Sequence, residues 1–225
     1  EVGSPLNGDF ESLETHAALR ASMGEDFYQA QYQQSPVMPG GNIIKLEWLQ
    51  RYTMPIVAKG KAHVVFSWDT AFGTGDSNDW SVGTAWLVQD GHYYLVDVVR
   101  GRFNGGDLIK AITDLWAKYP VSERTILLEK INGIELIANG VEAATGTEPE
   151  LVAPIHSKVS RLWSLTWIFQ HGDVYLPDQA HWLAEYVKEL TAFPRAKHDD
   201  QVDATSQFLT WITTRPDQSV RQSWV

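Results

Sequence analysis

The chain has 225 residues, of which 44% are hydrophobic, and a net charge of −10 at pH 7; no apolar run is long enough to cross a bilayer. It contains no cysteine, which excludes disulfides, thiolate zinc sites and cysteine nucleophiles. The acidic balance argues against a broad nucleic-acid-binding surface, but it is compatible with an acidic site for divalent cations.

The first part of the chain shows no sustained hydrophobic period. Turn-rich stretches such as SPVMPGGN interrupt it. We therefore expect residues 1–57 to be an extension or linker from a preceding domain, residues 58–215 to form one domain, and residues 216–225 to be a tail.

Three β-rich segments open the expected domain. HVVFSWD (63–69) suits a buried strand. WSVGTAWLV (80–88) and HYYLVDVV (92–99) lie on either side of Asp90 and Gly91, a dipeptide typical of tight hairpins. The three segments predict consecutive antiparallel strands.

The hydrophobic period then becomes helical. Leu108, Ile112 and Leu115 recur at helical spacing in GGDLIKAITDLWAKY (105–119). The elements expected after it are strand 124–129, helix 131–144, strand 150–155, helix 157–170, strand 173–177, helix 180–190 and a final helix 199–213.

This order predicts an α/β fold. Three antiparallel strands followed by parallel strands with crossover helices form a mixed sheet of five or more strands, with helices on both faces. The order is that of the ribonuclease H-like arrangement. The analogy concerns the fold alone, so function has to be argued from a site.

Acidic residues end two of the expected strands. Asp69 ends 63–69 and Glu129 ends 124–129; in a fold of this order these strands are parallel neighbours, so both carboxylates would emerge at one sheet edge. The final helix opens with Asp199, Asp200 and Asp203, and it could bring Asp200 to the same place. Pairs of these aspartates lie three or four residues apart and share a helix face.

Carboxylates gathered at one point repel each other, and hard divalent cations such as Mg²⁺ or Mn²⁺ would relieve that repulsion. Two ions about 4 Å apart can activate a water and stabilise the leaving oxygen of a phosphodiester. In this assignment Asp69 bridges both ions, Glu129 holds one and Asp200 the other. Asp199 and Asp203 are further ligands or supports.

Each acid also has a simpler explanation. Asp69 could be a solvated strand end, Glu129 could pair with Lys130 on the surface, and aspartates in a first helical turn suit the helix dipole. The acids together, in this order of elements, are far more specific than any one of them.

Several stretches resemble the C-terminal nuclease domain of tailed-phage terminase large subunits. They are SWDTAFGTGDSNDWSVGTAWLV, LLEKINGIELI, HSKVSRLWSLTWIFQHGDVYLP and FPRAKHDDQVDATSQFL. YQAQYQQSPVMPGGNIIKLEWLQRY also resembles the segment that joins the ATPase of that family to its nuclease. The resemblance covers most of residues 27–213, and HDDQVDA in its context is its most specific part.

The resemblance implies a metal-dependent endonuclease, using Mg²⁺ or Mn²⁺, that cuts concatemeric double-stranded DNA during packaging. Carried over by motif, Asp69, Glu129 and Asp200 match the metal-binding acids, with Asp199 a close candidate; the choice between Asp199 and Asp200 stays open. The implied partners are double-stranded DNA, an ATPase domain, the portal and the small terminase subunit, in the host cytoplasm. The chain has no GxxxxGK[ST] phosphate loop, so ATP binding and DNA translocation are not carried over.

Two basic residues begin the expected helix 157–170. Lys158 and Arg161 could contact the DNA backbone, as positive points in an acidic domain, or form a solvated helix edge.

Two other functions remain open at this point. One is another ribonuclease H-like nuclease, such as a Holliday-junction resolvase or a transposase core. The other is a non-catalytic module that uses the ten tryptophans to bind glycans. Most of these tryptophans lie in regular apolar patterns, which favours core packing.

Overall fold

The computed structural model describes residues 42–53, 62–71 and 80–215, which belong to one compact unit, Asn42–Val225. The expected tail 216–225 and most of the expected extension 1–57 lie outside the described residues. None of the described helices is long and apolar enough to cross a membrane.

A mixed sheet of seven strands forms the centre of the described structure. From one edge to the other the order is β1-β7-β4-β3-β2-β5-β6. Neighbours among β2, β3 and β4 are antiparallel, whereas β5 and β6 continue in parallel from β2, and β7 and β1 continue in parallel from β4. The strands are β1 (Gln50–Tyr52), β2 (His63–Asp69), β3 (Ser81–Gln89), β4 (His92–Gly101), β5 (Glu123–Glu129), β6 (Glu150–Val152) and β7 (Val174–Pro177).

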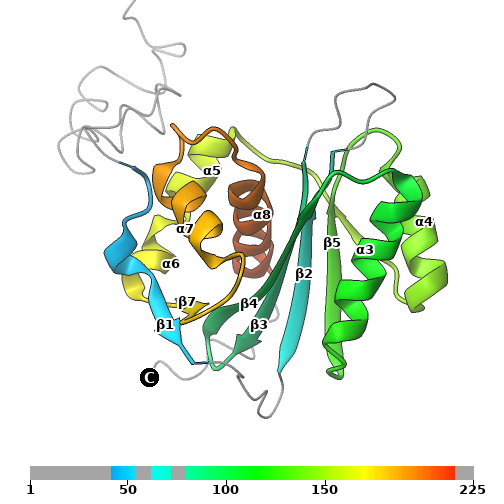
Figure 1. Ribbon diagram of the computed structural model, residues 1–225, viewed down its shortest axis with the longest axis horizontal. Coiled ribbons are helices and arrows are strands. Elements are labelled where there is room, and N and C mark those ends of the chain that lie inside the picture. Colours follow the sequence, from blue (N-terminus) through cyan, green and yellow to red (C-terminus); the bar gives the residue numbers. More distant parts are fainter. Residues whose placement is uncertain (1–41, 54–61, 72–79, 216–225) are drawn as a thin grey trace, which may run out of the picture. The chain divides into compact units, whose positions relative to one another are not determined.

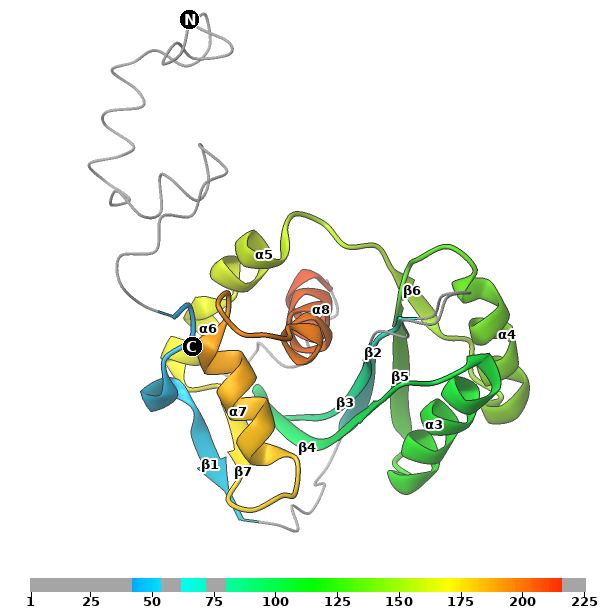
Figure 2. The same ribbon diagram turned by 45° about the horizontal axis from the view of Figure 1, so that its top comes forward.

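Helices cover both faces of this sheet. Figures 1 and 2 show α3 (Gly105–Lys118) and α4 (Ile134–Thr145) on one side, and α5 to α8 on the other. These last helices are α5 (Lys158–Ser164), α6 (Thr166–His171), α7 (Leu183–Ala192) and α8 (Asp200–Thr214). The predicted α/β fold, a mixed sheet of five or more strands with helices on both faces, is confirmed.

The edge strand β1 is absent from the predicted elements. It follows a 3₁₀ helix, η1 (Leu46–Trp48), and pairs in parallel with β7. β1 falls within residues 1–57, the expected linker, yet it belongs to the sheet. Three residues are too few to show an alternation of polar and apolar side chains, so only the pairing reveals this strand. The boundary at residue 58 stays a prediction.

The predicted helix 157–170 is two helices, α5 and α6, that meet at Leu165. At the junction the hydroxyl of Thr166 donates to the carbonyl of Trp163 at 2.8 Å, and that of Ser164 donates to the carbonyl of Arg161 at 2.8 Å. The backbone N–H of Leu165 reaches only three residues back, to Leu162. Side-chain competition for the carbonyls and a tight turn therefore end the first helix.

Two other predicted elements are shorter than expected. β6 ends at Val152, two residues before Pro154, which has no N–H for a strand ladder. α4 begins at Ile134 because Gly133 has a φ of 84°, in the left-handed region that a helix cannot continue through.

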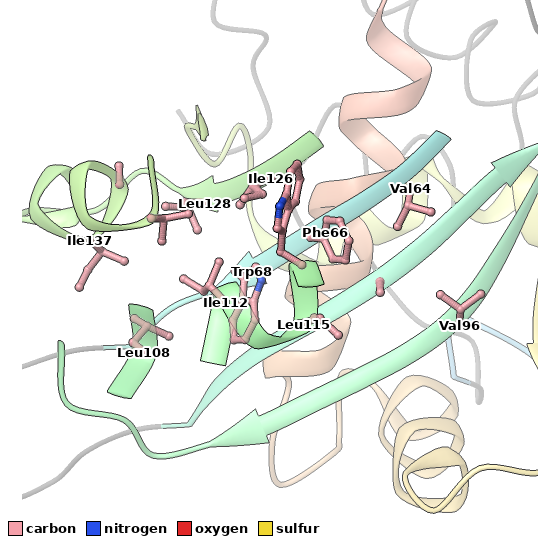
Figure 3. Packing of buried hydrophobic residues seen from close by; sticks show 14 of the residues in the cluster. Val64, Phe66, Trp68, Val96, Leu108, Ile112, Leu115, Ile126, Leu128 and Ile137 are labelled. Carbon is pink, nitrogen blue, oxygen red and sulfur yellow. The ribbon is translucent and has the colours of Figure 1, made fainter. Parts of the chain in front are cut away.

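The alternation of β2 divides its side chains between the two faces of the sheet. Val64, Phe66 and Trp68 point into the apolar core beneath α3 and α4. Figure 3 shows these side chains packed against residues of α3 and of β5. Ser67, one position out of phase, contacts α8 on the opposite face. Asp69 shares the phase of Ser67, so its side chain belongs to the α8 face.

Most of the tryptophans in the described residues serve the core, as the apolar patterns predict. The buried ones are Trp68, Trp86, Trp116, Trp182 and Trp211. Trp167 is 48% exposed. A single strongly exposed indole does not make the aligned platform that glycan stacking requires.

We expect Gly83→Ala to destabilise the protein by about 1–3 kcal/mol through overpacking. Gly83 lies opposite Trp68 in the β2–β3 ladder, and a β-carbon there would be 2.4 Å from Cε2 of Trp68. Because Trp68 precedes Asp69, a shift of the indole would also move the end of β2. Urea denaturation followed by circular dichroism measures the change.

Gly106→Ala is the matched control. A β-carbon at this exposed position, in the first turn of α3, would meet only Asn104 Oδ1, at an ordinary contact distance of 3.6 Å. We expect no loss of stability. Equal stability of the two variants would show that the contact between Gly83 and Trp68 does not constrain the sheet.

Candidate active site

The parallel pairing of β2 and β5 brings the first two predicted acids together. Trp68 is in register with Leu128, so Asp69 and Glu129 follow side by side at the carboxyl ends of the two strands. Leu128 points into the same core as Trp68, and the next residue on each strand faces α8. The predicted adjacency of these strands and their acids is thus present in the structure.

The two carboxyl groups interact strongly. Burial raises the pKa of Asp69 well above its ordinary value of 3.8, and a hydrogen bond and the negative charge of Glu129 raise it further. The charge of Asp203 raises it as well, whereas Lys158 lowers it. Acids from β5 and α8 therefore both act on the carboxyl of Asp69 at the end of β2.

Buried polar contacts fix α8 against β2. The hydroxyl of Ser67 donates to the carbonyl of Ala204 at 2.8 Å, and Gln207 Nε2 donates to Ser67 Oγ at 3.0 Å. On β3 the ring of Trp86 stacks on that of Phe208 with 4.8 Å between centroids. Figure 2 shows α8 between the sheet and helices α5 and α7. These contacts set the rotation of α8 and so decide which of its acids faces the end of β2.

Asp203 is the aspartate of α8 that lies deepest, with 4% of its surface exposed. Arg161 Nη2 donates to its Oδ1 at 2.5 Å, and Lys158 pairs with its Oδ2. Burial raises the pKa of Asp203, and the hydrogen bond and charge of Lys158 and the charge of Arg161 oppose that rise. Two basic residues of α5 thus make the burial of this carboxylate tolerable.

Asp199 and Asp200 have different partners. Asp199 lies just before α8 and accepts a hydrogen bond from Lys158 Nζ at 2.9 Å. Asp200 faces Arg100 of β4, whose Nη2 lies 3.4 Å from its Oδ2. The charge of Asp203 raises the pKa of Asp69. The pKa of Asp200 is raised by burial and by the charge of Asp199, and the charges of Arg100 and His198 oppose that rise. The structure therefore brings Asp203 to the paired strand ends and directs Asp200 toward β4.

Arg161 differs from its predicted position at a DNA-facing surface. It is 7% exposed, and its Nε donates to Ser206 Oγ at 2.8 Å in addition to the pair with Asp203. The sequence left Arg161 either facing DNA or on a solvated helix edge, but α8 packs on this residue. Its role in the described structure is internal support of Asp203. Lys158, with 50% of its side chain exposed, remains accessible to a ligand.

A second supporting network involves residues that the sequence did not single out. Glu189 of α7, 6% exposed, accepts hydrogen bonds from the backbone N–H of Gln201 at 2.7 Å and from its side chain at 2.6 Å. Arg100 pairs with Glu189 at 3.4 Å and with Asp200. This network ties the start of α8 to α7 and β4. No local pattern predicts this network, since the residues that it joins by hydrogen bonds lie 12 to 100 positions apart in the chain.

The arrangement of donors bears on whether a metal ion fits. Among the described residues, no group of three or more histidine, aspartate or glutamate side chains is arranged so that it could hold one. Basic side chains hold the aspartates at the start of α8 instead. The donor chemistry nevertheless fits a hard divalent cation, because Asp69, Glu129 and Asp203 offer only carboxylate oxygens, and the charges of Glu129 and Asp203 raise the pKa of the buried Asp69.

Comparison with solved structures gives the same fold. A large terminase from a thermophilic bacteriophage, in complex with ADP, has a TM-score of 0.61 at 12% identity, over 91% of this chain and 53% of that one. The large terminase nuclease of thermophilic phage G20c with bound magnesium has a TM-score of 0.55 at 15% identity, over 77% of this chain and 98% of that one. The same nuclease with bound cobalt has a TM-score of 0.54 at 16% identity, over 77% and 98%.

This chain therefore spans about half the length of the ADP-bound large terminase and nearly all of the G20c nuclease. It has no match among curated proteins. The family model described as "Terminase RNaseH-like domain" matches residues 66–210. This stretch runs from within β2 to within α8 and contains every predicted site residue. The chain belongs to the terminase RNaseH-like domain family.

Proposed function

We propose that this protein is a metal-dependent endonuclease that cuts concatemeric double-stranded DNA during phage genome packaging. The observation that carries the proposal is the electrostatic cluster of Asp69, Glu129 and Asp203, contributed by three elements of a terminase RNaseH-like domain. Magnesium and cobalt bound to the G20c nuclease support a requirement for divalent metal.

In this proposal Asp69, Glu129 and Asp203 hold two Mg²⁺ or Mn²⁺ ions, with Asp199 beside them. Bound cations would lower the pKa of the attacking water and stabilise the negative charge on the leaving 3′ oxygen. Arg161 keeps the carboxylate of Asp203 in place by holding one of its oxygens. We assign to Asp203 the role that the motif gives to Asp200, because the charge of Asp203 raises the pKa of Asp69 whereas Asp200 pairs with Arg100.

The partners in the proposal follow from the relatives. The large terminase that is solved in complex with ADP is about twice as long as its matched region, which supports an ATPase domain in the full-length subunit. We propose double-stranded DNA as the substrate, the portal and the small terminase subunit as further partners, and the host cytoplasm as the place of action.

Incubation with supercoiled plasmid tests the activity. We expect nicked and linear products with Mg²⁺ or Mn²⁺ and none with EDTA. Asp114→Asn is a suitable control, because Asp114 is an exposed acid on α3, paired with Lys110 on the far side of the sheet, and should cleave like the wild type. Cleavage that is undiminished in EDTA would exclude the metal-dependent mechanism.

A substrate panel separates the alternative nucleases. We expect linear duplex DNA to be cut at least as well as a four-way junction or an RNA–DNA hybrid. A strong preference for the junction would instead indicate a Holliday-junction resolvase, and cleavage confined to specific end sequences would indicate a transposase core. The glycan-binding alternative has lost its basis, since the described tryptophans are largely in the core.

A further inference from the structure

Lys158 places its ammonium between two acids of the candidate site. Its Nζ lies 2.9 Å from Asp199 Oδ1, and it also pairs with Asp203 Oδ2. Ser157 caps α5 by accepting from the N–H of Ser160, which fixes the backbone from which the lysine extends. The positive charge of Lys158 on α5 therefore bridges Asp199 and Asp203 at the start of α8.

The ammonium also lies near the paired strand ends. Lys158 lowers the pKa of Asp69, so its charge reaches the carboxyl of β2 as well as those at the start of α8. An ammonium that pairs with two carboxylates of the proposed metal site holds a position that a metal ion would need. The oxygens that Lys158 engages are not free for a metal while it remains there.

The second cation of the site, Arg161, is held differently. Its guanidinium has a buried hydrogen bond to Ser206 besides the pair with Asp203, and its side chain is 8% exposed. The side chain of Lys158 is 50% exposed, and the contacts of its ammonium in the described residues are to carboxylates. Lys158 can therefore swing into solvent on its flexible stem while Arg161 stays in place.

We propose that Lys158 is an internal counterion that occupies the acid cluster in the metal-free protein and is displaced when a divalent cation binds, so that it sets the metal affinity of the site. The inference rests on the proposed metal-dependent function. Before metal binds, Lys158 reduces the repulsion among the acids and keeps the carboxylate of Asp203 positioned. When metal binds, its positive charge opposes the incoming cation.

The test is Mn²⁺ binding to the full chain without DNA, measured by titration calorimetry and by the loss of the free Mn²⁺ signal in electron paramagnetic resonance. We expect Lys158→Met to bind Mn²⁺ about tenfold more tightly or better, because a positive charge a few ångströms from the ion is removed. Lys158→Arg keeps the charge and should stay within about threefold of the wild type. Lys110→Met, which removes an exposed lysine from α3, should bind like the wild type.

A second measurement is the melting temperature with and without Mn²⁺. Lys158→Met should melt lower than the wild type in EDTA, and Mn²⁺ should raise its melting temperature by more than it raises that of the wild type. If Lys158→Met does not fold, Lys158→Gln replaces it in both measurements, with the same expectations.

The outcomes separate this inference from the proposed function. Unchanged or weaker Mn²⁺ binding by the neutral variants, with clear binding by the wild type, overturns the role of Lys158 and leaves the nuclease assignment standing. No Mn²⁺ binding by any variant overturns both.

Discussion

Replacing Asp69 with asparagine is expected to abolish DNA cleavage and, at the same time, to stabilise the metal-free protein. Asparagine keeps the size of the side chain but removes the charge that would hold a cation, and loss of several kcal/mol of transition-state stabilisation lowers the rate on the order of 10³-fold. The stability gain follows from the surroundings, because Asp69 is desolvated and faces the charges of Glu129 and Asp203. Plasmid cleavage and thermal melting in EDTA measure the two effects, and we expect melting to rise by at least about 2 °C.

The same substitution should flatten the dependence of stability on pH. The carboxyl of Asp69 binds its proton more tightly in the folded protein than in the unfolded chain, because its pKa is raised from an ordinary value of 3.8. Between these two pKa values the folded state binds more protons, so its stability falls as the pH rises through that interval. The wild type should therefore lose more stability than Asp69→Asn when EDTA-treated samples are taken from pH 4 toward neutral pH.

Asp114→Asn, on the opposite side of the sheet, controls for the loss of one acidic charge from an acidic protein. It should keep its cleavage activity and show the pH dependence of the wild type. Full cleavage by Asp69→Asn, or a lower melting temperature in EDTA, would contradict the assignment of Asp69 to a cluster of repelling carboxylates.

Replacing Arg161 with methionine is expected to cost about 3 kcal/mol of stability and to reduce cleavage strongly. Removing one partner of a buried ion pair leaves the other charge inadequately compensated, at a cost of about 3–5 kcal/mol. The lower end applies here because Lys158 still contacts Asp203. Ser206 also loses the donor that lies 2.8 Å from its hydroxyl. Urea denaturation measures the stability, and the plasmid assay measures the activity.

The double variant Arg161→Met/Asp203→Asn makes this prediction specific. With the acid neutralised there is no buried charge to compensate, so the double variant should recover most of the stability that Arg161→Met loses. It should remain inactive because a proposed metal-holding carboxylate is gone. A double variant as unstable as the single one would show that Arg161 stabilises the protein through packing rather than through Asp203.

The sequence predicted the fold because the strands that form its centre carry strong local patterns. HVVFSWD forms β2 with the expected bounds, 63–69, and the Asp90-Gly91 dipeptide turns β3 into β4. Pairing rules for this order of elements predict Asp69 beside Glu129, and the register of β2 with β5 agrees. These features follow from local residue patterns and from general rules for pairing strands in a given order, and both can be applied to a single sequence.

Only the tertiary structure shows which aspartate of HDDQVDA has a charge that raises the pKa of Asp69. The three aspartates, Asp199, Asp200 and Asp203, lie within about one helical turn of each other. The residues that each of them faces therefore depend on the rotation of α8 about its axis. That rotation is set by contacts with distant residues, such as Ser67 of β2 and Glu189 of α7. The burial of Arg161 has the same origin, because α8 packs on a side chain that the sequence left either facing DNA or in solvent.

The sequence by itself thus determined the order of elements, the mixed sheet and the edge at which Asp69 and Glu129 end. The packing of helices across that edge decided the partners of each charge: Asp203 with Arg161 and Lys158, and Asp200 with Arg100. Hydrophobic periodicity is a local property of the chain, whereas the energy of a buried charge depends on residues brought near it only by folding.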